Sequence, residues 1–146
     1  MTYTTPPSEA PLDQPLYGAT LPQAVQRFFK KYATFSGRAS RSEYWWVTLA
    51  FIILYGVFGG IVGATGHLGS DGVFHVEGFG LVIAIIWVLV SLAVIVPSIA
   101  LTVRRLHDGN FSGWLYLLHL IPSLGSLIVF ILTLLPSKPE GARFDK

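Results

Sequence analysis

Residues 78–114 read GFGLVIAIIWVLVSLAVIVPSIALTVRRLHDGNFSGW, an uncharged run of 26 residues followed by a short charged motif. As a helix rising about 1.5 Å per residue, the uncharged run at 78–103 can cross a hydrocarbon core about 30 Å thick. Two further apolar runs of membrane length lie at residues 44–65 and 114–135. The sequence therefore predicts an all-α membrane protein with three transmembrane helices.

The composition excludes several classes of protein. Charged residues make up 12% of the chain, whereas soluble domains carry about 25%. The absence of cysteine removes disulfides, thiol nucleophiles and thiolate metal sites. A net charge of +2 is too small to indicate a nucleic-acid partner. We expect no cofactor and no metal site.

The regions before and after the predicted spans differ from them in composition. Residues 1–20 hold four prolines and few large apolar groups, which predicts a disordered N-terminal tail. Residues 21–34 place apolar side chains at helical spacing opposite lysine and arginine, which favours an amphipathic helix in the membrane interface. The alternative is an amphipathic helix packed on the rest of the protein. The membrane domain then covers residues 35–136, and 137–146 form a polar C-terminal tail.

Charged residues near the predicted spans gather in two motifs, FSGRASRSEYWW at 35–46 and RRLHDGNFSGW at 104–114. Ser40 and Glu43 have the spacing of a capping box, which would satisfy free amides where the first span begins. We expect aromatic rings next to the motifs to anchor the helices at the headgroup level, namely Tyr44, Trp45, Trp46 and Trp114. The candidate structural or ligand cluster comprises Arg38, Arg41, Glu43, Arg104, Arg105, His107 and Asp108.

Small residues recur along the first predicted span. Glycines spaced four apart remove side-chain bulk and let a second helix approach closely. The residues concerned are Gly56, Gly59, Gly60 and Gly63. They predict a helix-packing face, either within the chain or toward a second copy or another membrane protein.

The basic residues also predict an orientation. The connection at 66–77 has no lysine or arginine, so the positive-inside rule places it outside and the N-terminus in the cytoplasm. With three spans, three of the ten basic residues would lie outside, in the C-terminal tail. A turn at Pro122–Gly125 would instead make the third segment a re-entrant hairpin and place all ten inside. We favour three spans, because hairpin arms of about 8 and 12 residues are too short to cross the core.

The two motifs together resemble the bacterial domain-of-unknown-function family 805 of small inner-membrane proteins. The first match comprises Gly37, Arg38, Arg41, Glu43, Tyr44 and Trp45. The second comprises Arg104, Arg105, Leu106, His107, Asp108, Ser112, Gly113 and Trp114. The resemblance covers roughly residues 28–145 and implies a bacterial inner-membrane location. It implies no mechanism, and the ending Ala142-Arg143-Phe144-Asp145 departs from the family's usual Asn-Arg-aromatic-Gly.

Two functional hypotheses use the charged cluster without catalysis. In the first, Glu43 and Asp108 pair with arginines of the other motif and hold the helix ends together. In the second, four arginines outnumber two carboxylates, so the remaining positive charge binds an anionic lipid headgroup or a phosphate ligand.

Two further hypotheses are an enzyme and an oligomeric transporter. An enzyme would use His107 and Asp108 beside Glu43 as acid and base. A transporter subunit would use His119, the one ionisable residue well inside a predicted span. Most motif residues already have a cap, turn or anchor role, so we expect a non-enzymatic binding or accessory component with no catalytic residue.

Overall fold

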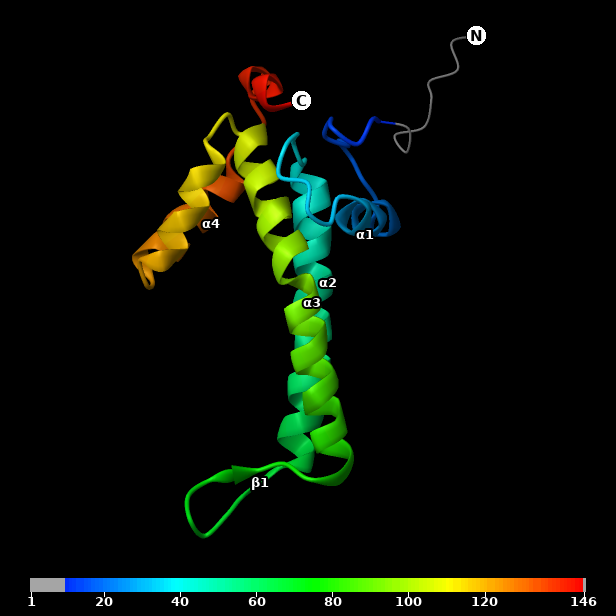
Figure 1. Cartoon of the computed structure of the whole chain (residues 1–146), viewed down its shortest axis with the longest axis vertical. Coiled ribbons are helices and arrows are strands. Elements are labelled where there is room, and N and C mark those ends of the chain that lie inside the picture. Colours follow the sequence, from blue (N-terminus) through cyan, green and yellow to red (C-terminus); the bar gives the residue numbers. More distant parts are fainter. Residues whose placement is uncertain (1–9, 146) are drawn as a thin grey trace. The chain divides into compact units, whose positions relative to one another are not determined.

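The computed structural model describes residues 10–145, which are mostly helical (Figure 1). The elements in chain order are α1 (Leu21–Lys30), α2 (Arg41–Thr65), β1 (His67–Leu68), β2 (Phe74–His75), α3 (Gly78–Asp108), the 3-10 helix η2 (Gly113–Leu120), α4 (Leu124–Leu134) and the 3-10 helix η3 (Pro139–Phe144). The described residues form two compact units. We call residues 10–47 and 96–145 the charged unit and residues 48–95 the helical-pair unit.

The helices α2 and α3 are long and apolar enough to cross a membrane. Their apolar side chains are largely exposed, as at Ile52 and Leu89, which are 64% and 61% exposed. A core helix of a soluble protein would bury such side chains, whereas a bilayer provides them with lipid contacts. The prediction of an all-α membrane protein is confirmed. The expected spans 44–65 and 78–103 lie inside these two helices, which also include residues of the charged motifs.

Within the helical-pair unit, α2 and α3 are joined by the short antiparallel hairpin of β1 and β2. The Trp87 ring on α3 contacts the Tyr55 ring on α2 at 6.1 Å between centroids. A Cβ at Gly59 would lie 3.5 Å from the same tryptophan, so this glycine packs within the chain. Apart from chain neighbours and the nearby backbone of α2 itself, no described atom lies within 4 Å of the Cβ position at the other three glycines, Gly56, Gly60 and Gly63. A packing face formed by those three stays a prediction.

The third apolar segment differs from the expected continuous helix over 114–135. It forms a helical hairpin in which η2 and α4 pack together and residues 121–123 make the turn. The break has a backbone cause, because Pro122 lacks an amide hydrogen and Ser123 adopts a positive φ of 62°. With 11 residues, α4 is about 16 Å long, roughly half of a hydrocarbon core. This geometry matches the hairpin alternative for the segment.

The segment before α1 has a defined structure where the sequence suggested disorder. Leu16 and Ala19 are buried, while residues 1–9 of the expected tail lie outside the described residues. The amphipathic helix expected at 21–34 is present as α1, which is shorter and begins with a capping box from Thr20. One face of α1 is buried against the rest of the charged unit, while Phe29 is 55% exposed.

Candidate functional site

The interior of the charged unit is unusually polar. Six charged side chains are almost completely buried, which costs free energy unless each finds a partner. They are Arg27, Lys31, Glu43, Arg104, Arg105 and Asp108. Four of the six belong to the two motifs, so the motifs form an internal network rather than a solvated surface.

Glu43 is the centre of the first cluster. Its Oε1 accepts a hydrogen bond from Arg27 Nε at 2.5 Å, and its Oε2 accepts from the amides of Leu16 and Ser40, both at 2.9 Å. The Ser40 hydroxyl in turn accepts from the Glu43 amide at 3.1 Å, which confirms the predicted capping box. The Arg27 guanidinium also donates to three carbonyl oxygens in the segment 10–14. The cluster therefore fastens α1 and that segment to the start of α2.

The partner of Glu43 differs from the one expected. An arginine of the other motif was predicted, but Arg27 on α1 takes this position. The sequence gives a partial signal for this position of Arg27. Arg27 lies one helical turn from Gln23 and from Lys31, and the apolar residues Ala24 and Phe28 lie close to it on the same helix. That signal indicates a helix face, however, and does not identify a carboxylate partner.

Asp108 is the centre of the second cluster. Its Oδ2 accepts from Arg105 Nη1 at 2.6 Å and from the Ser137 hydroxyl, and its Oδ1 accepts from the Tyr17 hydroxyl at 3.1 Å. The Arg38 Nη1 lies 3.9 Å from Oδ1, so the expected ion pair between the motifs exists here at long range. Burial and then the charge of Asp108 raise the pKa of Tyr17. Motif reasoning missed Tyr17 and Ser137, because each lies in a segment with the composition of a tail.

Arg105 is fully buried and uses three of its nitrogens. Besides Asp108, it donates from Nε to the Thr133 carbonyl at 3.0 Å and from Nη2 to the Leu135 carbonyl. Both carbonyls lie at the C-terminal end of α4, where helices leave acceptors unsatisfied. Arg105 therefore caps α4 and holds it to α3.

Arg104 performs a similar role for α1. Its Nη1 donates to the carbonyl oxygens of Lys31 and Thr34, at 2.8 and 2.6 Å, in the turn that follows α1. Its Nε has no hydrogen-bond partner within residues 10–145. The nearby Lys31 amine is also buried, and burial followed by the charge of Arg104 lowers the pKa of Lys31 to about 8.

Arg38 holds the C-terminal segment. It forms a two-pronged pair with Asp145, from Nε at 2.8 Å and from Nη2 at 2.7 Å, which raises the pKa of Arg38. The amide of Gly37 also donates to the Phe144 carbonyl at 2.7 Å. Residues 144 and 145 thus lie beside the first motif, even though the chain ending departs from the resembled pattern.

Arg41 is the motif arginine that does not take part in this network. It is exposed and makes no hydrogen bond or ion pair with the described part of the chain. It lines a cavity of about 370 Å³, here called the Arg41 pocket, together with Tyr17, Gly18, Ser40, Ser42, Pro136 and Ser137. The four hydroxyl groups of this lining already form hydrogen bonds within the chain, so the Arg41 guanidinium supplies the donors that remain.

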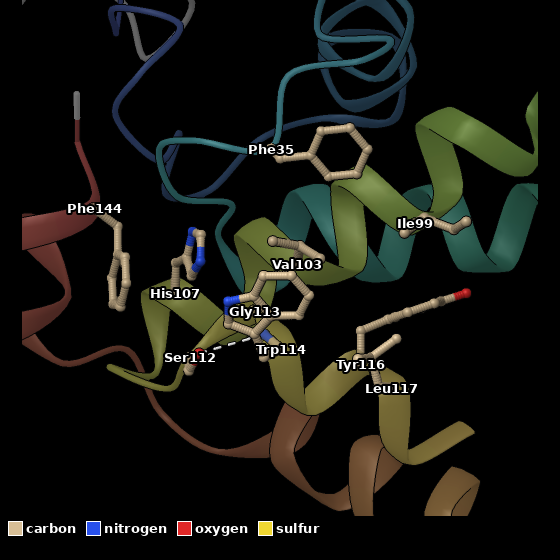
Figure 2. Close-up of a pocket in the computed structure, with 10 residues that line it drawn as sticks. All are labelled: Phe35, Ile99, Val103, His107, Ser112, Gly113, Trp114, Tyr116, Leu117 and Phe144. Atoms are coloured by element: carbon tan, nitrogen blue, oxygen red, sulfur yellow. Dashed lines mark hydrogen bonds between the residues drawn. The ribbon is translucent and has the colours of Figure 1, made fainter. Parts of the chain in front are cut away.

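A second cavity, of about 420 Å³, lies beside His107 and is here called the His107 pocket (Figure 2). Four residues of the second motif line it: His107, Ser112, Gly113 and Trp114. The remaining lining side chains are Phe35, Ile99, Val103, Tyr116, Leu117 and Phe144. The motif thus forms a largely apolar cavity in addition to the buried ion pairs.

The acid–base group considered from sequence is not assembled. His107 contacts the Gly37 carbonyl through Nδ1, whereas Asp108 is bound by Arg105, Ser137 and Tyr17. Glu43 is bound in the separate cluster with Arg27. Each carboxylate therefore balances a buried arginine, and neither orients the histidine.

Comparison with known proteins adds to this picture. Inner membrane protein YhaH of Escherichia coli (strain K12) is 35% identical over 118 residues, which cover 81% of this chain and 89% of YhaH. Inner membrane protein YhaI of the same strain is 34% identical over 102 residues, 70% of this chain and 75% of YhaI. No solved structure matches the chain. Residues 32–146 match the family described as "Protein of unknown function (DUF805)", and the chain belongs to that family.

Proposed function

We propose that this DUF805 member is a non-enzymatic binding component of the bacterial inner membrane that holds the phosphate of an anionic lipid at Arg41. The observation that carries this proposal is the unequal use of the motif arginines. Arg38, Arg104 and Arg105 donate to partners within the chain, whereas Arg41 donates to none of the described residues. Its charge is therefore available to a ligand.

The surroundings of Arg41 suit a phosphate ester. A guanidinium presents paired donors that match two phosphate oxygens. Arg41 is also the first residue of α2, so it lies where an apolar helix would meet the headgroup layer. Basic pockets at the cytoplasmic boundary suit anionic headgroups.

The proposal includes a topology with two full spans and both chain ends in the cytoplasm. Its support is the contact of Asp145 with Arg38, which holds the C-terminal segment beside the start of α2. All ten basic residues then lie on one side of the membrane, as the positive-inside rule favours. A second copy or another membrane protein remains a proposed partner for the open glycines Gly56, Gly60 and Gly63.

The test compares lipid retention by Arg41→Gln and by the matched control Lys30→Gln, which removes an exposed charge from α1. Each full chain is purified in nanodiscs with equal phosphatidylglycerol and phosphatidylcholine, and retained lipid is measured by native mass spectrometry. We expect wild type and Lys30→Gln to retain phosphatidylglycerol. Arg41→Gln should retain about tenfold less of this lipid, because it loses one hydrogen bond from a charged group.

Two further measurements complete the test. Equal retention of phosphatidylglycerol by Arg41→Gln and wild type, with equal thermal unfolding, would overturn the proposal. Competition by soluble glycerol 3-phosphate identifies the recognised group as the phosphate ester itself, whereas phosphatidylglycerol retention that resists this competitor identifies the membrane lipid as the ligand.

A further inference from the structure

We infer that the His107 pocket is a second, separate binding site, which takes one apolar chain ending in a hydroxyl group, supplied from the membrane. This site shares with the Arg41 pocket neither a lining residue nor a ligand chemistry. The inference therefore goes beyond the proposed phosphate site and does not depend on it.

The walls of the pocket select an apolar chain. Aromatic and aliphatic side chains surround the cavity (Figure 2), and its volume of about 420 Å³ lies within the range of small-molecule sites. The rim is open, since Trp114 and Leu117 are 79% and 51% exposed. Both belong to η2, the first arm of an apolar hairpin, so a chain dissolved in lipid can enter from that side.

The acceptor nitrogen of His107 lies in this apolar site without a hydrogen-bond donor among residues 10–145. The Nδ1 of His107 lies 3.0 Å from the Gly37 carbonyl, and a carbonyl only accepts, so Nδ1 carries the proton. In the neutral ring, Nε2 is then a hydrogen-bond acceptor, and no described residue donates to it. The Phe144 ring stacks on the imidazole at 4.0 Å and 3°, which holds the ring in this orientation.

Glycine at position 113 keeps the approach to this acceptor open. A Cβ there would lie 3.0 Å from His107 Nε2 and 2.6 Å from Val103 Cγ1. A side chain at this position would therefore occupy the space that a ligand needs. This gives a physical reason for the Ser-Gly-Trp part of the motif, because Ser112 and Trp114 line the same cavity.

The unpaired acceptor specifies the polar end of the ligand. A hydroxyl can donate to Nε2, whereas an ether or ketone oxygen cannot. An ammonium group would add positive charge near Arg143, whose guanidinium lies 4.6 Å from the centre of the Phe144 ring. The Ser112 hydroxyl, which accepts from the Trp114 amide, keeps its own hydrogen to donate to the ligand oxygen. A long-chain alcohol satisfies all of these groups.

The test uses 1-dodecanol as the probe and dodecyl methyl ether as its non-donating match. The full chain, labelled with ¹⁵N-histidine, is placed in phosphatidylcholine nanodiscs, and the imidazole nitrogen resonances are followed during titration. We expect dodecanol to shift one Nε2 resonance. The ether should bind about fivefold more weakly, because it cannot form the one neutral hydrogen bond that dodecanol donates. The responding resonance should be absent in His107→Gln.

A pocket-filling pair keeps the test valid if His107→Gln does not fold. Leu117→Trp should abolish the dodecanol response, whereas Leu120→Trp, at an exposed position of η2 outside the lining, should retain it. Arg41→Gln should also retain it, which separates this site from the phosphate site. No Nε2 shift with dodecanol, an equal shift with the ether, or an unchanged response in Leu117→Trp would each overturn the inference.

Discussion

Replacing Glu43 by glutamine should destabilise the folded protein far more than a change of one surface charge. The carboxylate accepts from the Arg27 guanidinium and from two backbone amides. Glutamine has one acceptor oxygen and one NH2 group, so the NH2 group must face at least one of these three donors. The substitution therefore leaves a buried cation without its counter-charge and creates a contact between two donors.

The size of the effect follows from burial. The Arg27 and Glu43 side chains are 7% and 4% exposed, so water cannot replace the lost partner. Breaking a buried ion pair from one side costs about 3–5 kcal/mol. About 1.4 kcal/mol is a tenfold change in an equilibrium constant. The equilibrium constant for unfolding should therefore increase by roughly two to three and a half orders of magnitude.

The assay is reversible unfolding in mixed micelles titrated with dodecyl sulfate, followed by tryptophan fluorescence. Glu77→Gln, an exposed carboxylate outside both clusters, is the matched control and should change little. The double variant Arg27→Met with Glu43→Gln should cost less than the sum of the single variants, because it leaves no unpaired charge. A free energy of unfolding for Glu43→Gln within about 1 kcal/mol of the Glu77→Gln value would refute the reasoning.

Three other predictions test the rest of the charged unit. The pKa of Lys31 falls from 10.5 when unfolded to about 8 when folded, so the unfolded state binds more protons between these values. Stability should therefore rise by about 3 kcal/mol from pH 8 to pH 10.5. Lys31→Met should abolish this rise and exposed Lys30→Met should keep it, as measured by unfolding at each pH. Gly125→Ala should destabilise the helical hairpin and increase its proteolysis, because the new Cβ would overlap the Leu118 carbonyl oxygen, whereas Gly60→Ala faces open space. A fluorescent reporter fused after Lys146 should be active in the cytoplasm, and a reporter active only outside would contradict the proposed position of the C-terminus.

The sequence could predict those features that depend on local spacing or on length. The capping box of Ser40 and Glu43 needs three residues of helix, and the two membrane-length helices need only a sufficient apolar run. The partner of Glu43 could not be predicted in this way, because Arg27 reaches it only once α1 packs beside the start of α2.

The conformation of the third apolar segment, residues 114–135, was harder to predict for a related reason. Hydropathy measures how apolar a segment is and says nothing about its direction. Pro122 marked a place where the chain could turn, but a single span was favoured because hairpin arms of about 8 and 12 residues are too short to cross the hydrocarbon core. A tertiary contact holds α4, the second arm of the hairpin, because Arg105 binds the carbonyls at the end of this helix. A contact that joins residues 105 and 135 leaves no periodic trace in the sequence.

The two adjacent arginines of the second motif now have a physical explanation. A helix leaves its last carbonyl groups without intrahelical partners, and a low-dielectric environment makes that deficit costly. Arg105 donates to carbonyls at the end of α4, and Arg104 donates to those of the turn that follows α1, so one helical turn of α3 holds the ends of two other helices. Arginine suits this task because its planar group offers five donors in fixed directions. Counting carboxylates alone had suggested two uncompensated charges. Counting carbonyl acceptors and Asp145 as well leaves Arg41 as the motif arginine that donates to no other residue within 10–145, which is where the ligand is proposed to bind.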